Sequence, residues 1–349
     1  MSCLSGRAPP NTGEPSSHWS ERERLAMFRI RWLHIFLTIL VVSAMLGTTN
    51  VTAQDATPAA VKKFARKFDI GGRSLFLNCQ GAGSPTVILE HAGYYGGSGD
   101  YTRVLGRIAE FTRVCTYDRA NTLGDSDAAP VPRSGADVVN DLHALLAAAE
   151  VPGPYVMVGL SIGGLFARLY ASTYPDEVVG MVLLETVPEE YESRTREMVD
   201  PDLWAAYEAL WEGNFDPERF YPTGLVWDEL EAEVRAARQV SPLRPMPLVV
   251  VTLETPESTC DEYRQGAIRN VGSCFPPDWP IEEDIALWRS LQEELAALVP
   301  GGRVLLSTQN EHLLPESDPV LVVDAIRQVV EAVRDPSTWP APTTGTPAA

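Results

Sequence analysis

Short runs of apolar residues alternate with longer segments of mixed polarity through most of the chain. Runs typical of strands buried on both faces occur at residues 86–90, 113–117, 155–158, 178–184, 247–251 and 303–307. Apolar positions at helical spacing separate many of them, as at 137–146 and 165–174. Two further strands, 64–70 and 73–79, flank a Gly-Gly pair that predicts a hairpin turn. The pattern predicts an α/β protein with a mostly parallel, doubly wound sheet.

The alternation stops between residues 188 and 245, where the sequence is helical in pattern, rich in aromatic residues and without a buried strand. We interpret this stretch as an inserted helical cap whose aromatic side chains mainly form a core of their own. The main domain is expected to span 54–335. The last residues, 336–349, are rich in Pro, Thr and Ala, a composition typical of disorder.

The N-terminus carries an apolar run of 15 residues, 32–46, which is short for a membrane span. Two arginines precede the run, and small residues ending at Ala53 follow it. This order predicts a secretory signal peptide within 1–53, and a start at Met27 would give it the usual length. The alternative is a membrane anchor formed by the uncleaved run.

The formal net charge of −19 argues against nucleic acid or an anionic membrane as a partner. A membrane partner is expected only if the N-terminal segment stays uncleaved.

Export would also change the interpretation of the cysteines. Cleavage after Ala53 leaves four of them, an even number without the paired spacing of a zinc site. Disulfides are therefore expected rather than a metal centre. Cys260 and Cys274 lie in one irregular stretch that a local disulfide would close.

Residues 155–164 contain the strongest chemical motif, Gly159-x-Ser161-x-Gly163, between an apolar strand and a helical pattern. A serine at a sharp strand-to-helix turn needs neighbours without side chains, and its hydroxyl is then exposed at the end of the sheet. We therefore predict that Ser161 is a nucleophile and that the N–H of Ile162 stabilises an oxyanion.

A nucleophilic serine needs a general base, usually histidine, and the chain has five histidines. His18 and His34 lie in the segment expected to be removed. His143 lies within a helix and is interpreted as structural, while His91 suits an oxyanion loop. His312 follows the last strand in a polar loop and is the predicted base.

The base needs a carboxylate that fixes its tautomer. Two glutamates follow strands between the serine and the histidine, Glu185 directly and Glu254 three residues later. Glu185 adjoins a buried strand, where an unpaired carboxylate would be costly, so it is the preferred acid. Glu254 remains the alternative.

A second oxyanion donor is expected in the loop after Glu90. Gly93 lets that backbone turn inward, which makes the N–H of Tyr94 the predicted donor.

Together these segments resemble the α/β-hydrolase superfamily over residues 64–334. The matching pieces, in order, are TVILEHAG at 86–93, CTYDRAN at 115–121, GLSIGG at 159–164, YPDEVVGMVLL at 174–184 and NEH at 310–312. The resemblance implies the α/β-hydrolase fold with strand 73–79 beside strand 113–117, and therefore a disulfide between Cys79 and Cys115. Two departures stand out: residues 252–257 lack the usual Asp, and the oxyanion loop has His-Ala-Gly in place of His-Gly.

The resemblance implies a serine hydrolase that uses neither metal nor organic cofactor, with carboxylic ester hydrolysis as the expected reaction on a small molecule. Amide or peptide cleavage, lactone opening or acyl transfer would use the same residues. Dehalogenation and epoxide opening are disfavoured, because they depend on an aspartate where this chain has Ser161. A non-catalytic binding protein on the same fold is the remaining alternative.

Overall fold

The structure, a computed structural model, describes residues 63–93, 97–214, 224–254, 276, 278–309 and 311–339. The predicted signal peptide at 1–53 and the predicted Cys260–Cys274 disulfide lie outside these ranges, so they stay predictions. Among the described helices, none is long and apolar enough to cross a bilayer.

Eight strands form one sheet in the order β1-β2-β4-β3-β5-β6-β7-β8. The first two strands pair antiparallel as a hairpin, β2 also pairs antiparallel with β4, and all the other pairs are parallel. This arrangement confirms the predicted doubly wound, mostly parallel sheet. The strands are β1 (Phe64–Asp69), β2 (Ser74–Gln80), β3 (Thr86–Glu90), β4 (Val114–Tyr117), β5 (Tyr155–Leu160), β6 (Val178–Leu184), β7 (Leu248–Leu253) and β8 (Arg303–Ser307).

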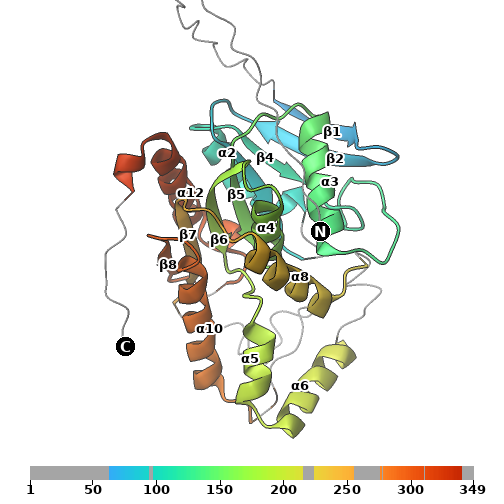
Figure 1. The fold of residues 1–349 in the computed structure, drawn as a ribbon, viewed down its shortest axis with the longest axis vertical. Coiled ribbons are helices and arrows are strands. Elements are labelled where there is room, and N and C mark those ends of the chain that lie inside the picture. The colour runs from blue at the N-terminus through green and yellow to red at the C-terminus, as the bar shows by residue number, and fades with distance from the viewer. Residues whose placement is uncertain are drawn as a thin grey trace, which may run out of the picture. The chain divides into compact units, whose positions relative to one another are not determined.

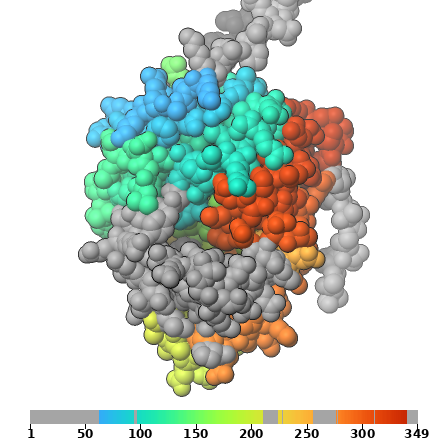
Figure 2. Space-filling view, turned by 180° about the vertical axis from the view of Figure 1, so that it is seen from behind, coloured from blue at the N-terminus to red at the C-terminus, as the bar shows by residue number. Residues whose placement is uncertain are grey.

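Helices cover both faces of the sheet, because successive side chains of each buried strand point to opposite sides. One apolar cluster joins the sheet to α3 (Gly135–Ala148), α4 (Gly163–Thr173) and α8 (Trp227–Val240) (Figure 1). The other joins it to α2 (Thr102–Ala109) and α12 (Pro319–Arg334). Figure 2 shows the segment around α2 side by side with the red C-terminal helices, which α2 contacts. The remaining helices are η1 (Ser98–Tyr101), α5 (Tyr191–Met198), α6 (Pro201–Asn214), α10 (Ile281–Ala296), α11 (Leu314–Ser317) and η2 (Pro336–Thr338).

Two helix starts follow directly from the sequence. The Ser134 side chain accepts from the N–H of Asp137, and the Asp137 carboxylate accepts from the N–H of Ser134, which forms a capping box for α3. Asp318 caps α12, and Pro319 occupies its first turn. Ser134 and Asp318 are residue types that favour the N-cap position.

The described part of 188–245 is helical, but its helices belong to two different apolar clusters. Leu230 and Val234 of α8 belong to the main core, whereas Trp204 of α6 belongs to a separate small cluster. In that cluster the Tyr207 ring lies 5.1 Å from the Trp204 ring and 4.8 Å from the Trp279 ring. These aromatic residues pack on one another, and α8 is part of the main domain.

The structure describes the first residues of the tail that was predicted to be disordered. Pro336–Thr338 form η2, which Asp335 caps through its side chain. The Arg303 guanidinium lies 4.0 Å from the centre of the Trp339 ring. An aromatic residue in a tail rich in Pro and Thr thus extends the folded domain to residue 339. The rest of the tail lies outside the described residues.

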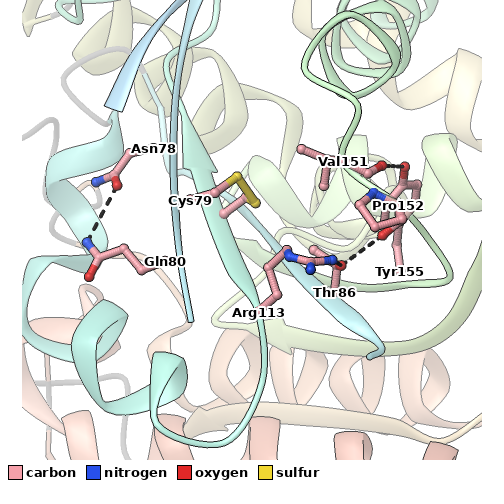
Figure 3. The surroundings of a disulfide bond; sticks show 9 residues. Asn78, Cys79, Gln80, Thr86, Arg113, Val151, Pro152 and Tyr155 are labelled. Atoms are coloured by element: carbon pink, nitrogen blue, oxygen red, sulfur yellow. Dashed lines mark hydrogen bonds between the residues drawn. A yellow bond between two sulfur atoms is a disulfide. The ribbon is translucent and has the colours of Figure 1, made fainter. Parts of the chain in front are cut away.

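Cys79 of β2 and Cys115 of β4 are register partners in the antiparallel pair, and a disulfide joins them. Both side chains are fully buried. Figure 3 shows the bond between the two strands.

The disulfide should stabilise the domain mainly by restricting the unfolded chain, because it closes a loop with a sequence separation of 36 residues. A loop of that size corresponds to about 3–4 kcal/mol. Replacing Cys79 and Cys115 by alanine, in a background that lacks Cys260 and Cys274, should lower the free energy of unfolding by about that amount. Urea denaturation of the two proteins measures the difference. Equal stabilities would contradict the prediction.

Candidate active site

The site begins with the register of three neighbouring parallel strands. Leu160 of β5 pairs with Leu184 of β6, and Leu184 pairs with Val251 of β7. The N–H of Ser161 donates to the carbonyl of Leu184 at 3.0 Å, and the N–H of Glu185 donates to the carbonyl of Val251 at 2.8 Å. Ser161 and Glu185 therefore leave the same edge of the sheet side by side.

The turn at Ser161 has the strained geometry that its glycines predict. Its φ is +56°, in the left-handed region that side chains disfavour. A Cβ at Gly159 would lie 2.5 Å from the Cα of Gly164, and a Cβ at Gly163 would lie 2.4 Å from the carbonyl oxygen of Glu90. The turn therefore requires glycine at both positions, and it lies directly against the end of β3.

Glu185 is buried, 4% exposed, and it also has a positive φ of +41°. Its Oε1 accepts from the hydroxyl of Thr252 at 2.5 Å and from the N–H of Leu253 at 3.1 Å. Its Oε2 lies 3.5 Å from Nδ1 of His312. Burial favours the neutral carboxyl, but the hydrogen bond and charge of His312, together with these two donors, outweigh it and hold the pKa below its ordinary value.

His312 stands just before α11 with its side chain 42% exposed. With Nδ1 facing a carboxylate, Nε2 is the nitrogen left to accept a proton. His91, by contrast, is fully buried, with Nδ1 2.9 Å from the carbonyl of Ala92 and Nε2 accepting from the N–H of Arg119.

His143, the other described histidine, stacks on Tyr174 with ring centres 4.0 Å apart, and its Nδ1 lies 3.3 Å from the carboxylate of Glu177. This agrees with its interpretation as a structural residue.

Glu254, the alternative acid, is exposed at the end of β7. Its N–H donates to the carbonyl of Ser307, and its carbonyl accepts from Arg289. Within the described ranges, Glu185 is the carboxylate that pairs with His312.

The structure describes one of the two predicted oxyanion donors. Ile162 directly follows the serine at the start of α4, whereas Tyr94 lies outside the described residues. Over the described chain, no three His, Cys, Asp or Glu side chains converge as metal ligands.

Three residues that support the site were not identified from the sequence. Trp288 of α10 donates through Nε1 to the Thr252 hydroxyl at 3.3 Å, so it extends the hydrogen bonds that end on Glu185. Thr186 donates its hydroxyl to the carbonyl of Ser161 at 2.9 Å. Thr252 directly follows the predicted strand 247–251, and this position would have been a usable signal. No comparable signal existed for Trp288.

A buried group of charges ties the segment after Glu185 to two helices. The Arg168 guanidinium of α4 donates to Glu189 at 2.9 Å and to the carbonyl of Val187 at 3.1 Å. Arg238 of α8 lies 2.8 Å from the same Glu189 carboxylate. Arg168 and Glu189 are almost fully buried, so breaking this pair would leave an uncompensated charge.

Comparisons with known proteins agree with the observed fold. The sequence profile described as alpha/beta hydrolase fold matches residues 85–246. Among solved structures, Cfl2 from Burkholderia cenocepacia aligns with a TM-score of 0.51 and 18% identity, covering 76% of this chain and 95% of that one. E-2-(acetamidomethylene)succinate hydrolase aligns with a TM-score of 0.50 and 17% identity, covering 78% of this chain and all of that one. The protein therefore has the α/β-hydrolase fold.

Curated relatives match over shorter segments. Pimeloyl-[acyl-carrier protein] methyl ester esterase from Chromobacterium violaceum is 36% identical over 117 residues, 33% of this chain and 42% of that protein. An uncharacterized vacuolar membrane protein from Saccharomyces cerevisiae is 38% identical over 109 residues, 30% of this chain and 17% of that protein. The chain spans between 17% and 51% of the length of the curated relatives that it matches.

The lowered pKa of Glu185 predicts how the residue contributes to stability. Its contribution is complete above the unfolded pKa of about 4.3 and is lost as the pH falls through the lower folded pKa. The difference in free energy of unfolding between wild type and Glu185→Gln should therefore shrink as the pH falls below about 5. Urea denaturation at each pH measures it.

Glu254→Gln is the matched control, and its difference from wild type should stay small throughout because the residue is exposed. The prediction is contradicted if the difference in free energy of unfolding between wild type and Glu185→Gln grows as the pH falls. That result would show that the folded protein favours the protonated Glu185 carboxyl.

Proposed function

We propose that the protein is an exported serine hydrolase that cleaves carboxylic esters of small molecules. One observation carries the proposal: a buried carboxylate 3.5 Å from Nδ1 of His312 follows the strand next to the one that ends at Ser161. A serine, a histidine and an oriented carboxylate at one sheet edge are what acyl transfer through a covalent intermediate requires.

The proposed reaction begins with attack of the Ser161 oxygen on the ester carbonyl carbon, while Nε2 of His312 takes the hydroxyl proton. Glu185 remains ionised and stabilises the imidazolium that forms. The N–H groups of Ile162 and Tyr94 stabilise the oxyanion. His312 then gives its proton to the leaving alcohol, and water releases the acid from the acyl-enzyme by the same steps.

An ester is proposed as the substrate because the relative from Chromobacterium violaceum is a methyl ester esterase, and its similarity covers part of the chain. Export is supported by the N-terminal pattern and by the Cys79–Cys115 bond, since disulfides persist in oxidising compartments.

The nucleophile is tested by labelling the protein with a fluorophosphonate probe and by assaying nitrophenyl esters. Wild type should be labelled, and Ser161→Ala should lose both the label and at least about 10⁴-fold in kcat, because no other group can form the acyl-enzyme. Ser172→Ala is the control and should keep both, because Ser172 is a buried serine near the far end of α4, the helix that follows Ser161. A wild-type protein that neither reacts with the probe nor hydrolyses any ester would refute the hydrolase proposal.

The acid is tested by comparing two matched variants. Glu185→Gln should lower kcat by about 10²–10⁴-fold, because an amide cannot hold the histidine tautomer or stabilise the imidazolium. Glu254→Gln should stay within about twofold of wild type, since its side chain is exposed. Full activity in Glu185→Gln would exclude it as the acid.

A further inference from the structure

The CTYDRAN segment at 115–121 contributes a second buried cation near the site. The Arg119 side chain, 3% exposed, forms an ion pair with Glu90, which is 1% exposed. Its guanidinium also donates to the carbonyl of His91 at 2.8 Å and to the carbonyl of Ala92. One side chain that follows β4 thus binds three successive residues at the end of β3.

These contacts determine how the peptide groups after β3 are turned. In a trans peptide the carbonyl of one residue and the N–H of the next point in opposite directions. Holding the carbonyls of His91 and Ala92 therefore also orients the N–H groups of Ala92 and Gly93. The N–H of Ala92 donates to Asp100 at 3.0 Å, and the N–H of Gly93 points away from Arg119.

The backbone that Arg119 holds lies directly against the turn of the candidate nucleophile. A Cβ at Gly163 would lie 2.4 Å from the carbonyl oxygen of Glu90 and 2.6 Å from that of His91. A shift of this backbone would therefore displace Gly163, two residues after Ser161.

The rest of the environment keeps Arg119 in one orientation. The Tyr117 hydroxyl donates to the second oxygen of Glu90 at 2.6 Å, and the guanidinium lies 5.0 Å from the centre of the Phe166 ring. A buried ion pair is rarely the most stable way to fill a core, so stability alone accounts poorly for this one. The planar fork of arginine spreads five donors over three nitrogens and so reaches a carboxylate and two separate carbonyls, whereas the three donors of lysine all lie on one nitrogen.

We propose that Arg119 is a positioning residue for oxyanion stabilisation. By holding the His91 and Ala92 carbonyls it fixes the backbone that leads to the loop's oxyanion donor. Arg119 does not touch the substrate. The proposal rests on the proposed function, because it assumes that an oxyanion forms at Ser161.

Two variants test it. Arg119→Lys keeps a positive charge beside Glu90 but loses the fork. The double variant Glu90→Gln with Arg119→Met removes both charges, so neither is left uncompensated. Arg113→Met is the control, because Arg113 is also buried next to β4 but at its opposite end, where it donates to Thr86 at 3.4 Å (Figure 3).

Each protein is assayed on a nitrophenyl ester and on its thionoester, in which sulfur, a weak hydrogen-bond acceptor, replaces the carbonyl oxygen. Wild type should prefer the oxygen ester. Both Arg119 variants should lose roughly 10²-fold in kcat on the oxygen ester with KM within about threefold, because the donors act on the transition state. Their preference for oxygen over sulfur should fall by about tenfold or more, while the pH profile of kcat and the preference of Arg113→Met stay as in wild type.

A purely structural role would slow both esters in proportion and leave the oxygen preference unchanged, and that result in an active protein would overturn the proposal for Arg119 alone. A wild-type protein that hydrolyses neither ester would overturn the proposed function, and the role of Arg119 with it. Thermal unfolding of each variant shows that the compared proteins are folded.

Discussion

The candidate site depends on the hydrogen bonds between the carboxyl ends of β5, β6 and β7. They place Ser161 and Glu185 at neighbouring strand ends, and both residues take a positive φ there. Two left-handed residues side by side cost of order 1–2 kcal/mol each, a strain that only a well-packed sheet can hold. The apolar runs of these strands therefore do more than fill the core, because they keep the two candidate catalytic residues in unfavourable backbone conformations.

Most of the fold could be read from local patterns. Fully apolar runs identified the parallel strands, and the Gly-Gly pair identified the hairpin. Ser161 was identifiable because its glycines serve the turn itself, and His312 because few histidines competed with it. The sequence favoured Glu185 over Glu254 but left Glu254 as an alternative, since both follow buried strands. The carboxylate of Glu185 lies beside His312 only because two distant loops meet in the folded chain.

The residues that escaped prediction act through partners far away in the sequence. Trp288 supports Glu185 by way of Thr252, and Arg119 reaches back 29 residues to Glu90. Contacts between residues this far apart leave no periodic pattern in a single sequence. The insertion illustrates the same limit: its helical character was readable, but the division between α8, which joins the main core, and the aromatic cluster of α6 depends on which partners each helix meets.

The buried charges around Glu189 limit which segments can be exchanged in a chimera with a related protein. Arg168 belongs to the helix that follows the nucleophile turn, Arg238 belongs to the insertion, and Glu189 lies between them. A chimera whose exchanged segment includes α8 but not Glu189 would remove Arg238 from that carboxylate, and one that includes both would leave the buried Arg168 without its partner. The replaceable module is therefore the stretch around α5 and α6, and α8 should be inherited with the sheet.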